Sequence, residues 1–170
     1  MCIRDRYWAE SSGKLWLELE DFEKEFLYVN SLTAGVGSND IGLDRGQLGN
    51  QRIVFFKRIG PKVLMIQPNY SYRANTNDKK EKKAVADGFA QSALWGFKVE
   101  AEQSGKVLVD ATEFFFQDSH GIVDRLKSRK MGSYKVEKSR SAINLPGTMS
   151  FQKNTNVETI LTYVGTSPGS

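Results

Sequence analysis

Residues 52–67 read RIVFFKRIGPKVLMIQ, and this stretch decides the fold. Both arms around Gly60-Pro61 are filled with β-branched, aromatic and other large apolar side chains, which favour extended backbone. A glycine-proline pair between two such arms is typical of a tight turn, because glycine tolerates positive φ and proline fixes its own φ. The segment therefore predicts a β-hairpin with arms at Arg52–Ile59 and Lys62–Gln67.

Similar patterns recur on both sides of this hairpin. Ser104-Gly105 separates two further apolar arms, which predicts a second hairpin with arms at 93–103 and 106–114. Upstream, leucines at 15, 17 and 19 alternate with Trp16 and Glu18, as expected of a half-buried strand over 14–20. A polar turn follows it, and Phe26–Leu32 is predicted as the returning strand.

Helical periodicity is confined to two short segments. Asp78 and Glu81 resemble a capping box before Val85 and Phe89, and Asp118 or Ser119 opens a segment that puts Ile122 and Leu126 on one face. Downstream, strands are predicted at 134–137, 141–145 and 157–164. The sequence thus predicts an α+β fold with mostly antiparallel sheet, about seven to nine strands and two short helices.

The chain divides into three parts in this interpretation. Residues 1–12 form a non-native or unstructured leader: MCIRDR resembles translated adapter sequence, and no apolar stretch of signal-peptide length follows it. Residues 13–165 form a single β-rich domain. Residues 166–170 begin a linker, because Gly165-Thr-Ser-Pro-Gly-Ser is rich in turn residues. We expect the chain to be truncated at both ends.

Composition excludes several classes of protein. One cysteine leaves no internal disulfide, and one histidine leaves no zinc site built mainly from His and Cys. The apolar runs are too short for a membrane span. The net charge of +4 is concentrated in residues 121–140, which contain seven basic and two acidic side chains. Nucleic-acid binding is nevertheless disfavoured, because such clusters are usually solvated surface.

No catalytic residue, metal ligand or cofactor site is predicted within the chain. Asp118-Ser119-His120 contains the residue types of a hydrolase triad, but neighbours in sequence cannot adopt that geometry, so a helix-capping role with an exposed His120 is favoured. Asp110 is predicted to form a structural ion pair with an arginine, Arg140 being the candidate. Four aromatic residues could line a sugar or peptide groove, with packing in the core as the favoured alternative: Trp16, Trp95, Tyr70 and Tyr72.

Three long stretches resemble one protein family. They are FLYVNSLTAGVGSNDIGLDRGQLGNQRIVFFKRIGPKVLMIQPNYSYRA, SALWGFKVEAEQSGKVLVDATEFFFQDSHGIVDRLK and YKVEKSRSAINLPGTMSFQKNTNVETILTYVG. The resemblance runs from about Gly13 to Gly165, and its most specific parts are the NDIGLDRGQLG loop, the LVDATEF strand and the segment 139–158. The family is a domain of unknown function that lies N-terminal to the catalytic domain of bacterial zinc-dependent metalloproteases.

The resemblance implies a parent enzyme that is secreted or periplasmic and hydrolyses a peptide or protein substrate. Its zinc would be bound by an H-E-x-x-H helix in a downstream domain, and this chain would be a non-catalytic accessory domain that packs on that domain. A β-rich binding module for surface polysaccharide or another anionic polymer, and a steric pro-segment, are the alternatives. The glycine-rich loop 34–50 is the predicted interdomain contact, through Asn39, Asp40, Asp44, Arg45 and Gln47.

Overall fold

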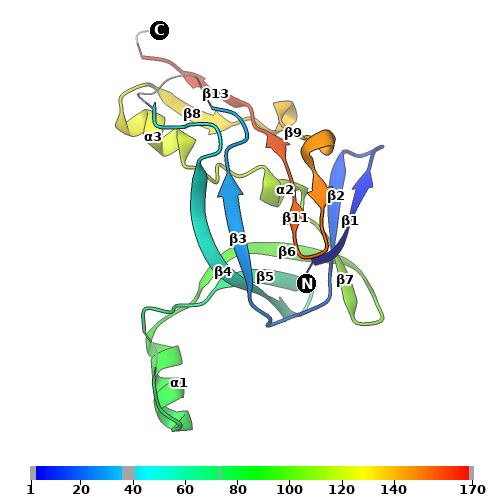
Figure 1. Cartoon of the computed structure of the whole chain (residues 1–170), viewed down its shortest axis with the longest axis vertical. Coiled ribbons are helices and arrows are strands. Elements are labelled where there is room, and N and C mark those ends of the chain that lie inside the picture. Colours follow the sequence, from blue (N-terminus) through cyan, green and yellow to red (C-terminus); the bar gives the residue numbers. More distant parts are fainter. Residues whose placement is uncertain (1–2, 36–40, 73, 169–170) are drawn as a thin grey trace.

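The computed structural model describes residues 3–35, 41–72 and 74–168. Its centre is a seven-stranded antiparallel sheet with the order β1-β2-β7-β6-β5-β4-β3. The strands are β1 (Ile3–Ala9), β2 (Lys14–Leu19), β3 (Phe26–Ser31), β4 (Leu48–Ile59), β5 (Lys62–Gln67), β6 (Ser92–Gln103) and β7 (Lys106–Asp110). Figure 1 shows the sheet curling strongly, so that β1 and β2 rise on one side of an open half-barrel and β3 on the other. The predicted β-rich, mostly antiparallel architecture is confirmed.

Both predicted hairpins are present. Strand β4 pairs with β5 through Phe56 opposite Met65, and β6 pairs with β7 through Gln103 opposite Lys106. At the second turn both central residues have positive φ, 51° for Ser104 and 79° for Gly105. That conformation matches the right-handed twist of the two strands, which explains why this dipeptide ends β6 and starts β7.

The core fills the concave side of the sheet. The predicted alternation in β2 is confirmed, since its three leucines are buried and the residues between them are not. Aromatic rings from β4, β6 and the helix after β7 meet at the centre, where Phe97 lies 6.0 Å from Phe56 and 5.3 Å from Phe114. The buried members are Leu17, Leu19, Val54, Phe56, Val63, Met65, Phe97, Val107, Val109, Ala111 and Phe114.

The N-terminal region differs from the prediction in two ways. Residues 3–9, placed in an unstructured leader by the sequence analysis, form β1, which pairs with β2 through Tyr7 opposite Trp16. Strand β3 does not return beside β2; it pairs with β4 at the opposite edge of the sheet. Strand β2 instead pairs with β7, because its buried leucines lie in register with Val107 and Val109.

Three α-helices are present among the described residues, one more than predicted. Helix α1 (Lys79–Gly88) begins as expected, with the Asp78 side chain accepting a hydrogen bond from the Lys80 N–H. Helix α3 (Ile122–Ser128) is also where periodicity placed it. The additional helix is the single turn α2 (Thr112–Phe115), which replaces the end of the predicted strand 106–114.

The C-terminal third adds short ribbons on one end of the half-barrel. The elements are β8 (Ser133–Val136), η2 (Lys138–Arg140), β9 (Ala142–Ile143), η3 (Leu145–Gly147), β10 (Met149–Ser150), β11 (Thr155–Asn156), β12 (Thr159–Ile160) and β13 (Tyr163–Thr166). They pair as β10 with β11, β12 with β9 and β13 with β8. A second small core of Leu15, Phe116 and Ile143 joins these ribbons to the sheet.

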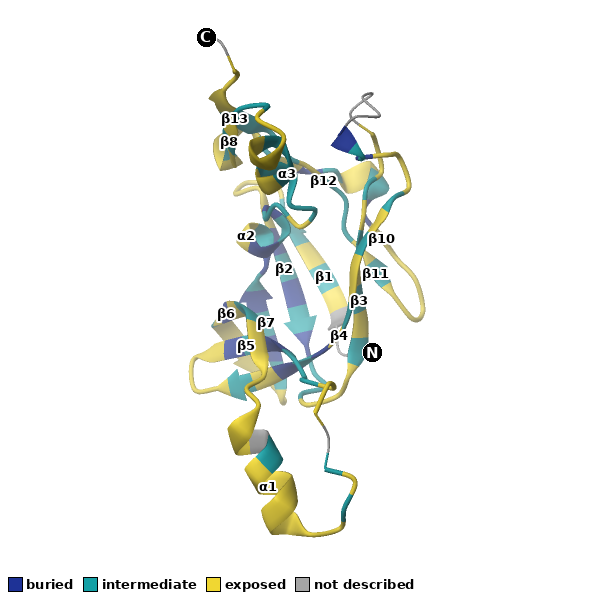
Figure 2. Cartoon of the chain, turned by 90° about the vertical axis from the view of Figure 1, so that its left-hand side faces the viewer, coloured by how far each residue is buried: buried dark blue, intermediate teal, exposed yellow. Residues whose placement is uncertain are grey.

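Exposure is uneven over the molecule. Figure 2 shows buried residues concentrated in the curled sheet, whereas α1 projects away from it and is almost wholly exposed. None of the helices in the described residues has the length and apolar character needed to cross a membrane.

Candidate interaction surface

The outer face of β3 and β4 carries a group of exposed apolar side chains. Leu27 is 59% exposed and stands directly opposite Ile53, while Val29, two residues further along β3, is also exposed. Leu48, opposite Ser31, is 57% exposed. These four side chains, Leu27, Val29, Leu48 and Ile53, are called the β3–β4 face below.

Local sequence explains why this face is apolar. Strand β3 reads FLYVNS, so that Phe26 and Tyr28 are half-buried against the core while Leu27 and Val29 point outward. A strand with one face in solvent normally alternates apolar with polar residues. Apolar residues on both faces of β3 were the sequence signal for this surface. The prediction of a simple returning strand at Phe26–Leu32 did not include it.

The described part of the predicted contact loop adjoins this face. Asn39 and Asp40 lie outside the described residues. Asp44 and Arg45 are exposed, and Gln47 is half-buried, its side-chain oxygen accepting a hydrogen bond from the Asp44 N–H at 3.2 Å. The loop runs from the end of β3 to the start of β4, so along the chain it leads directly to Leu48.

The same loop is anchored to its own domain. Leu43 is only 2% exposed and Ile41 is also buried. The Gly46 N–H donates to the Leu32 carbonyl at 2.7 Å, and Arg125 in α3 donates to the Gly42 carbonyl at 2.7 Å. The described part of the loop is therefore anchored to α3 through Gly42 and to the end of β3 through Gly46.

Asp110 forms its ion pair with Lys14 and not with Arg140. The Lys14 Nζ lies 2.8 Å from Asp110 Oδ2, because β2 and β7 are neighbours and Lys14 starts β2. Arg140 is in η2, near Glu137. Hydrogen bonds from Ser139 are the main cause of the lowered pKa of Glu137, and the charges of Lys135 and Arg140 add to them. The predicted partner was wrong since sequence separation does not reveal which strands become neighbours.

Asp110 is the last residue of β7, and its side chain hydrogen-bonds to Thr112, the first residue of α2. Its Oδ1 accepts hydrogen bonds from the Thr112 N–H at 3.0 Å and from the Thr112 hydroxyl at 2.7 Å. Burial raises the pKa of Asp110, but the hydrogen bonds from Lys14 and Thr112 together outweigh it and hold the pKa below its ordinary value. The carboxylate is thus a structural group whose ionised form stabilises the fold.

Replacing Asp110 with Ala is expected to lower the free energy of unfolding at pH 7 by about 1.5–3 kcal/mol, the usual contribution of hydrogen bonds to a charged group, because the contacts with Thr112 and Lys14 are lost. A carboxyl whose pKa is lowered by folding contributes stability above its unfolded pKa, and this contribution is lost as pH falls through the folded pKa. The difference in the free energy of unfolding between wild type and D110A should therefore become smaller below about pH 4. Urea unfolding at pH 7 and pH 3 measures it, with D110N, which retains an acceptor oxygen, as control. An equal difference in unfolding free energy at both pH values would contradict the role of the ionised Asp110 carboxylate in stability.

Asp118-Ser119-His120 forms a structural cap. Asp118 accepts hydrogen bonds from the N–H groups of Ile122 and Val123 and, at 3.0 Å, from the Tyr163 hydroxyl, so the predicted capping role is confirmed. His120 is partly buried, contrary to the prediction: its ring packs on β4, where a Cβ added to Gly49 would lie 3.1 Å from His120 Cε1. Its Nε2 is buried and has no hydrogen-bond partner among the described atoms. The three residues are not arranged as a triad.

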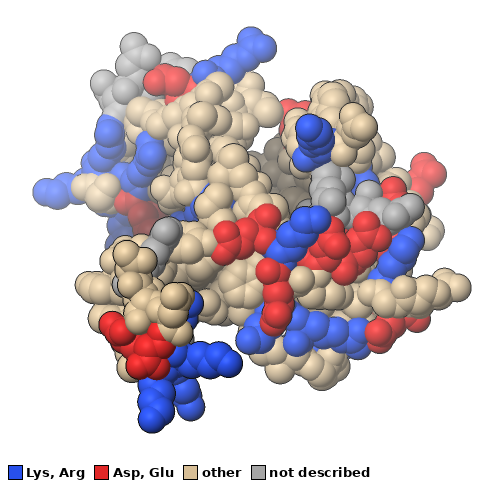
Figure 3. All heavy atoms as spheres, turned by 60° about the horizontal axis from the view of Figure 1, so that its bottom comes forward, with Lys and Arg blue, Asp and Glu red and all other residues tan. Residues whose placement is uncertain are grey.

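The basic residues of the chain are spread over separate elements. Helix α1 holds four lysines, and Figure 3 shows basic side chains gathered at this projecting part of the molecule. The basic segment 121–140 instead runs through α3, β8 and η2, where Arg125 is occupied by the loop contact described above and Lys138 pairs with Glu113. The two clusters lie on different parts of the fold.

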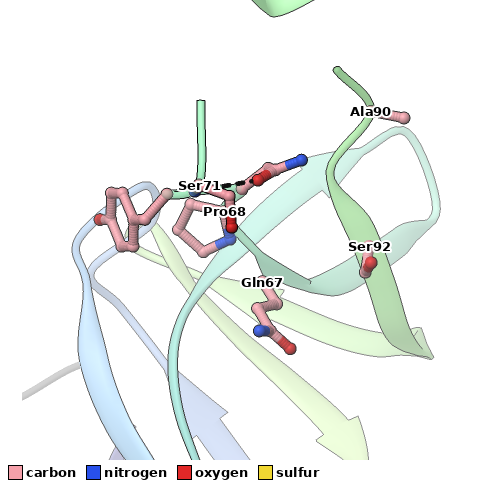
Figure 4. A pocket seen from close by; sticks show the side chains of 7 residues that line it. Gln67, Pro68, Ser71, Ala90 and Ser92 are labelled. Atoms are coloured by element: carbon pink, nitrogen blue, oxygen red, sulfur yellow. Dashed lines mark hydrogen bonds between the residues drawn. The ribbon is translucent and has the colours of Figure 1, made fainter. Parts of the chain in front are cut away.

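The four aromatic residues of the predicted groove are not brought together. Trp95 packs against the core, 5.9 Å from Phe114, and Trp16 lies under Lys14. Tyr72 stacks on Phe89 at the base of α1. Tyr70 alone lines a hollow of about 470 Å³, shown in Figure 4, with polar side chains including Gln67, Asn69, Ser71 and Ser92. This hollow is open to solvent, and none of the residues that line it is charged.

Within the described ranges, no three His, Cys, Asp or Glu side chains come close enough together to hold a metal ion. Neither the curated proteins nor the solved structures contain a match to the chain. A family model does match residues 46–170, most of the chain, and its description is a domain of unknown function, DUF5117. The chain therefore belongs to the DUF5117 family.

Proposed function

We propose that this chain is the non-catalytic N-terminal accessory domain of a secreted bacterial zinc-dependent metalloprotease, and that it packs through the β3–β4 face against the downstream catalytic domain. The observation that carries the proposal is the exposure of four large apolar side chains on one pair of neighbouring strands, with Leu27 directly opposite Ile53. Contiguous exposed apolar patches on soluble domains mark sites of protein contact. The resemblance of the sequence to domains that precede metalloprotease catalytic domains supplies the partner.

The surroundings of the face suit an interdomain contact. Interfaces of this kind combine an apolar centre with a polar rim. Asp44 and Arg45 are exposed in the loop between β3 and β4, and in this proposal they would belong to the polar rim. Burial of each large aliphatic side chain contributes about 1.5–3 kcal/mol before the costs of association, so four of them provide a useful part of a domain interface.

In this proposal the chemistry resides in the partner. The downstream domain would bind zinc and hydrolyse a peptide or protein substrate by means of a zinc-activated water. The domain described above would hold that catalytic domain in place or shape its substrate cleft. Export of the parent protein to the periplasm or the medium is part of the same proposal.

The first test is association of two separately produced parts, residues 1–170 and the catalytic domain encoded downstream. Calorimetry should detect a complex, and the double variant L27E/I53E should weaken it at least about 10-fold, equivalent to about 1.4 kcal/mol. Two carboxylates in an apolar interface lose their water without gaining partners. The matched control is Ile59→Glu, because Ile59 is an exposed residue of the same strand, about 20 Å from Ile53.

Two results of this binding test, and one result of a peptidase assay on the same two proteins, have distinct meanings. Equal weakening by I59E and L27E/I53E would show that the β3–β4 face is not the contact. Absence of a complex would overturn the proposal that this domain packs against a catalytic domain. Loss of peptidase activity when residues 1–170 are added to the catalytic domain would favour a steric pro-segment.

One observation favours a second candidate, a binding module for an anionic polymer. Helix α1 projects from the domain and carries Lys79, Lys80, Lys82 and Lys83 in its first half. Phosphate- or carboxylate-rich chains bind such clusters, with an affinity that falls as salt rises. Binding to an anionic polysaccharide that is weakened by salt and lost on changing these four lysines to Gln would support this candidate. Binding unaffected by those changes would exclude α1 as the site.

A further inference from the structure

The two edge strands of the central sheet, β1 and β3, differ in how well they are protected from pairing with another chain. Strand β1 carries Asp5 and Arg6 in its middle, and Arg6 donates hydrogen bonds to the Thr148 carbonyl, at 2.9 Å, and to the Ser150 hydroxyl. Charges on an edge strand and a covering segment both prevent another chain from pairing with it. The β1 edge is thus protected by its own sequence and by the C-terminal ribbons.

The β3 edge has neither form of protection. Its sequence, FLYVNS, contains no charged residue and no proline. In the described part of the chain, β3 is hydrogen-bonded to β4 alone and no segment pairs with its other side. Its one irregularity lies between Val29 and Ser31, so Phe26–Val29 remains a regular, uncharged and open edge.

The unpaired backbone groups of an open edge favour a particular conformation in a partner that binds there. In an antiparallel sheet every second residue of an edge strand directs its N–H and C=O away from the neighbouring strand. Water, polar side chains or a further extended backbone can satisfy these groups, but only an extended backbone supplies donors and acceptors at the repeat of the strand. A strand added there would lie about 4.8 Å from β3.

We infer that Phe26–Val29 accepts an extended strand from the downstream domain, which continues the sheet as an eighth strand. This inference rests on the proposed function and specifies how the contact is made. The incoming strand would carry apolar residues at alternate positions, because one of its faces must lie beside Leu27 and Val29. Its other face would lie beside Phe26 and Tyr28, which are half-buried at the open side of the core. Strand addition of this kind combines backbone hydrogen bonds with side-chain selectivity.

Residue-resolved amide exchange on the whole protein and on residues 1–170 tests this inference. In residues 1–170 alone, the amides of Phe26–Val29 that face the open edge should exchange rapidly. In the presence of the downstream domain they should slow by about 100-fold, as amides in a paired strand do. The amides of β1, on the protected edge, are the internal control and should not change. The methyl NMR signals of Leu27 and Ile53, measured on the same samples, report whether the β3–β4 face is in contact with the partner.

The outcomes separate the inference from the proposed function. If the methyl signals shift while the β3 amides still exchange rapidly, the domains pack face to face without an added strand, and only the inference fails. If neither changes, the proposed contact fails as well. Protection that appears in residues 1–170 alone, and rises with concentration together with a dimer in sedimentation, would assign the edge to a second copy and overturn the inference.

Discussion

Replacing Phe114 with Ala is expected to lower the free energy of unfolding by about 3–5 kcal/mol, the range for removing a buried phenylalanine. The ring is 7% exposed and contacts aromatic rings from two strands, β3 and β6, and from its own helix. Its centroid lies 5.6 Å from that of Tyr28, 5.9 Å from Trp95, 5.3 Å from Phe97 and 5.1 Å from Phe115. Removing the ring would therefore leave a cavity bordered by these aromatic side chains.

Urea unfolding followed by tryptophan fluorescence measures this effect, since Trp95 is one of the neighbours. The control is Phe89→Ala, because Phe89 is 38% exposed and stacks only on Tyr72 at the base of α1. Removal of such a surface ring should cost less than about 1 kcal/mol. Phe114→Leu, which refills part of the volume, should lie between the two variants. Similar losses for F114A and F89A would mean that α2 is not part of the core.

The role of Phe114 illustrates what sequence patterns reveal about this fold. Regular alternation at Leu15, Leu17 and Leu19 and the two turn dipeptides were enough to predict five of the central strands, because these signals are local. Helix α2 was missed since Lys106–Phe114 continues the apolar alternation of a strand. The turn arises from Asp110, whose carboxylate binds Thr112 and ends β7. That side chain could equally have faced solvent in a longer strand.

Strand order could not be predicted because it depends on contacts far apart in the sequence. Strand β2 pairs with β7, more than eighty residues away, and leaves β3 at the other edge. For this reason the ion-pair partner of Asp110 was wrong, and the β3–β4 face was not anticipated. Which apolar residues remain exposed is decided only when the sheet order is known. Of the predicted loop residues, Asp44 and Arg45 are exposed, and their contact with a partner stays a prediction.

Replacing Gly165 with Ala is expected to separate β13 from β8. A Cβ at this position would lie 1.9 Å from the Ser133 carbonyl oxygen and 2.8 Å from Tyr134 Cα, both backbone atoms that cannot turn aside. Gly165 stands opposite Tyr134 in this ribbon, so relief of the clash requires the two strands to move apart. We expect a local cost of about 3 kcal/mol, at the upper end of the values for overpacking.

Amide exchange in β8 and β13 measures this opening and should accelerate by about 100-fold, while the amides of β5 and β6 keep their wild-type rates. Loss of the ribbon also frees Tyr163, whose pKa is raised by burial and by the neighbouring Asp118 carboxylate. The pKa of this tyrosine should therefore fall toward its ordinary value of about 10 in G165A. Gly88→Ala is the matched control, because a Cβ there meets no atom within 4 Å and a helix prefers alanine to glycine. If G165A retained slow exchange in β8 and the raised Tyr163 pKa, the close approach of β13 to β8 would be wrong, and the C-terminal ribbons would have to pack on the half-barrel in another register.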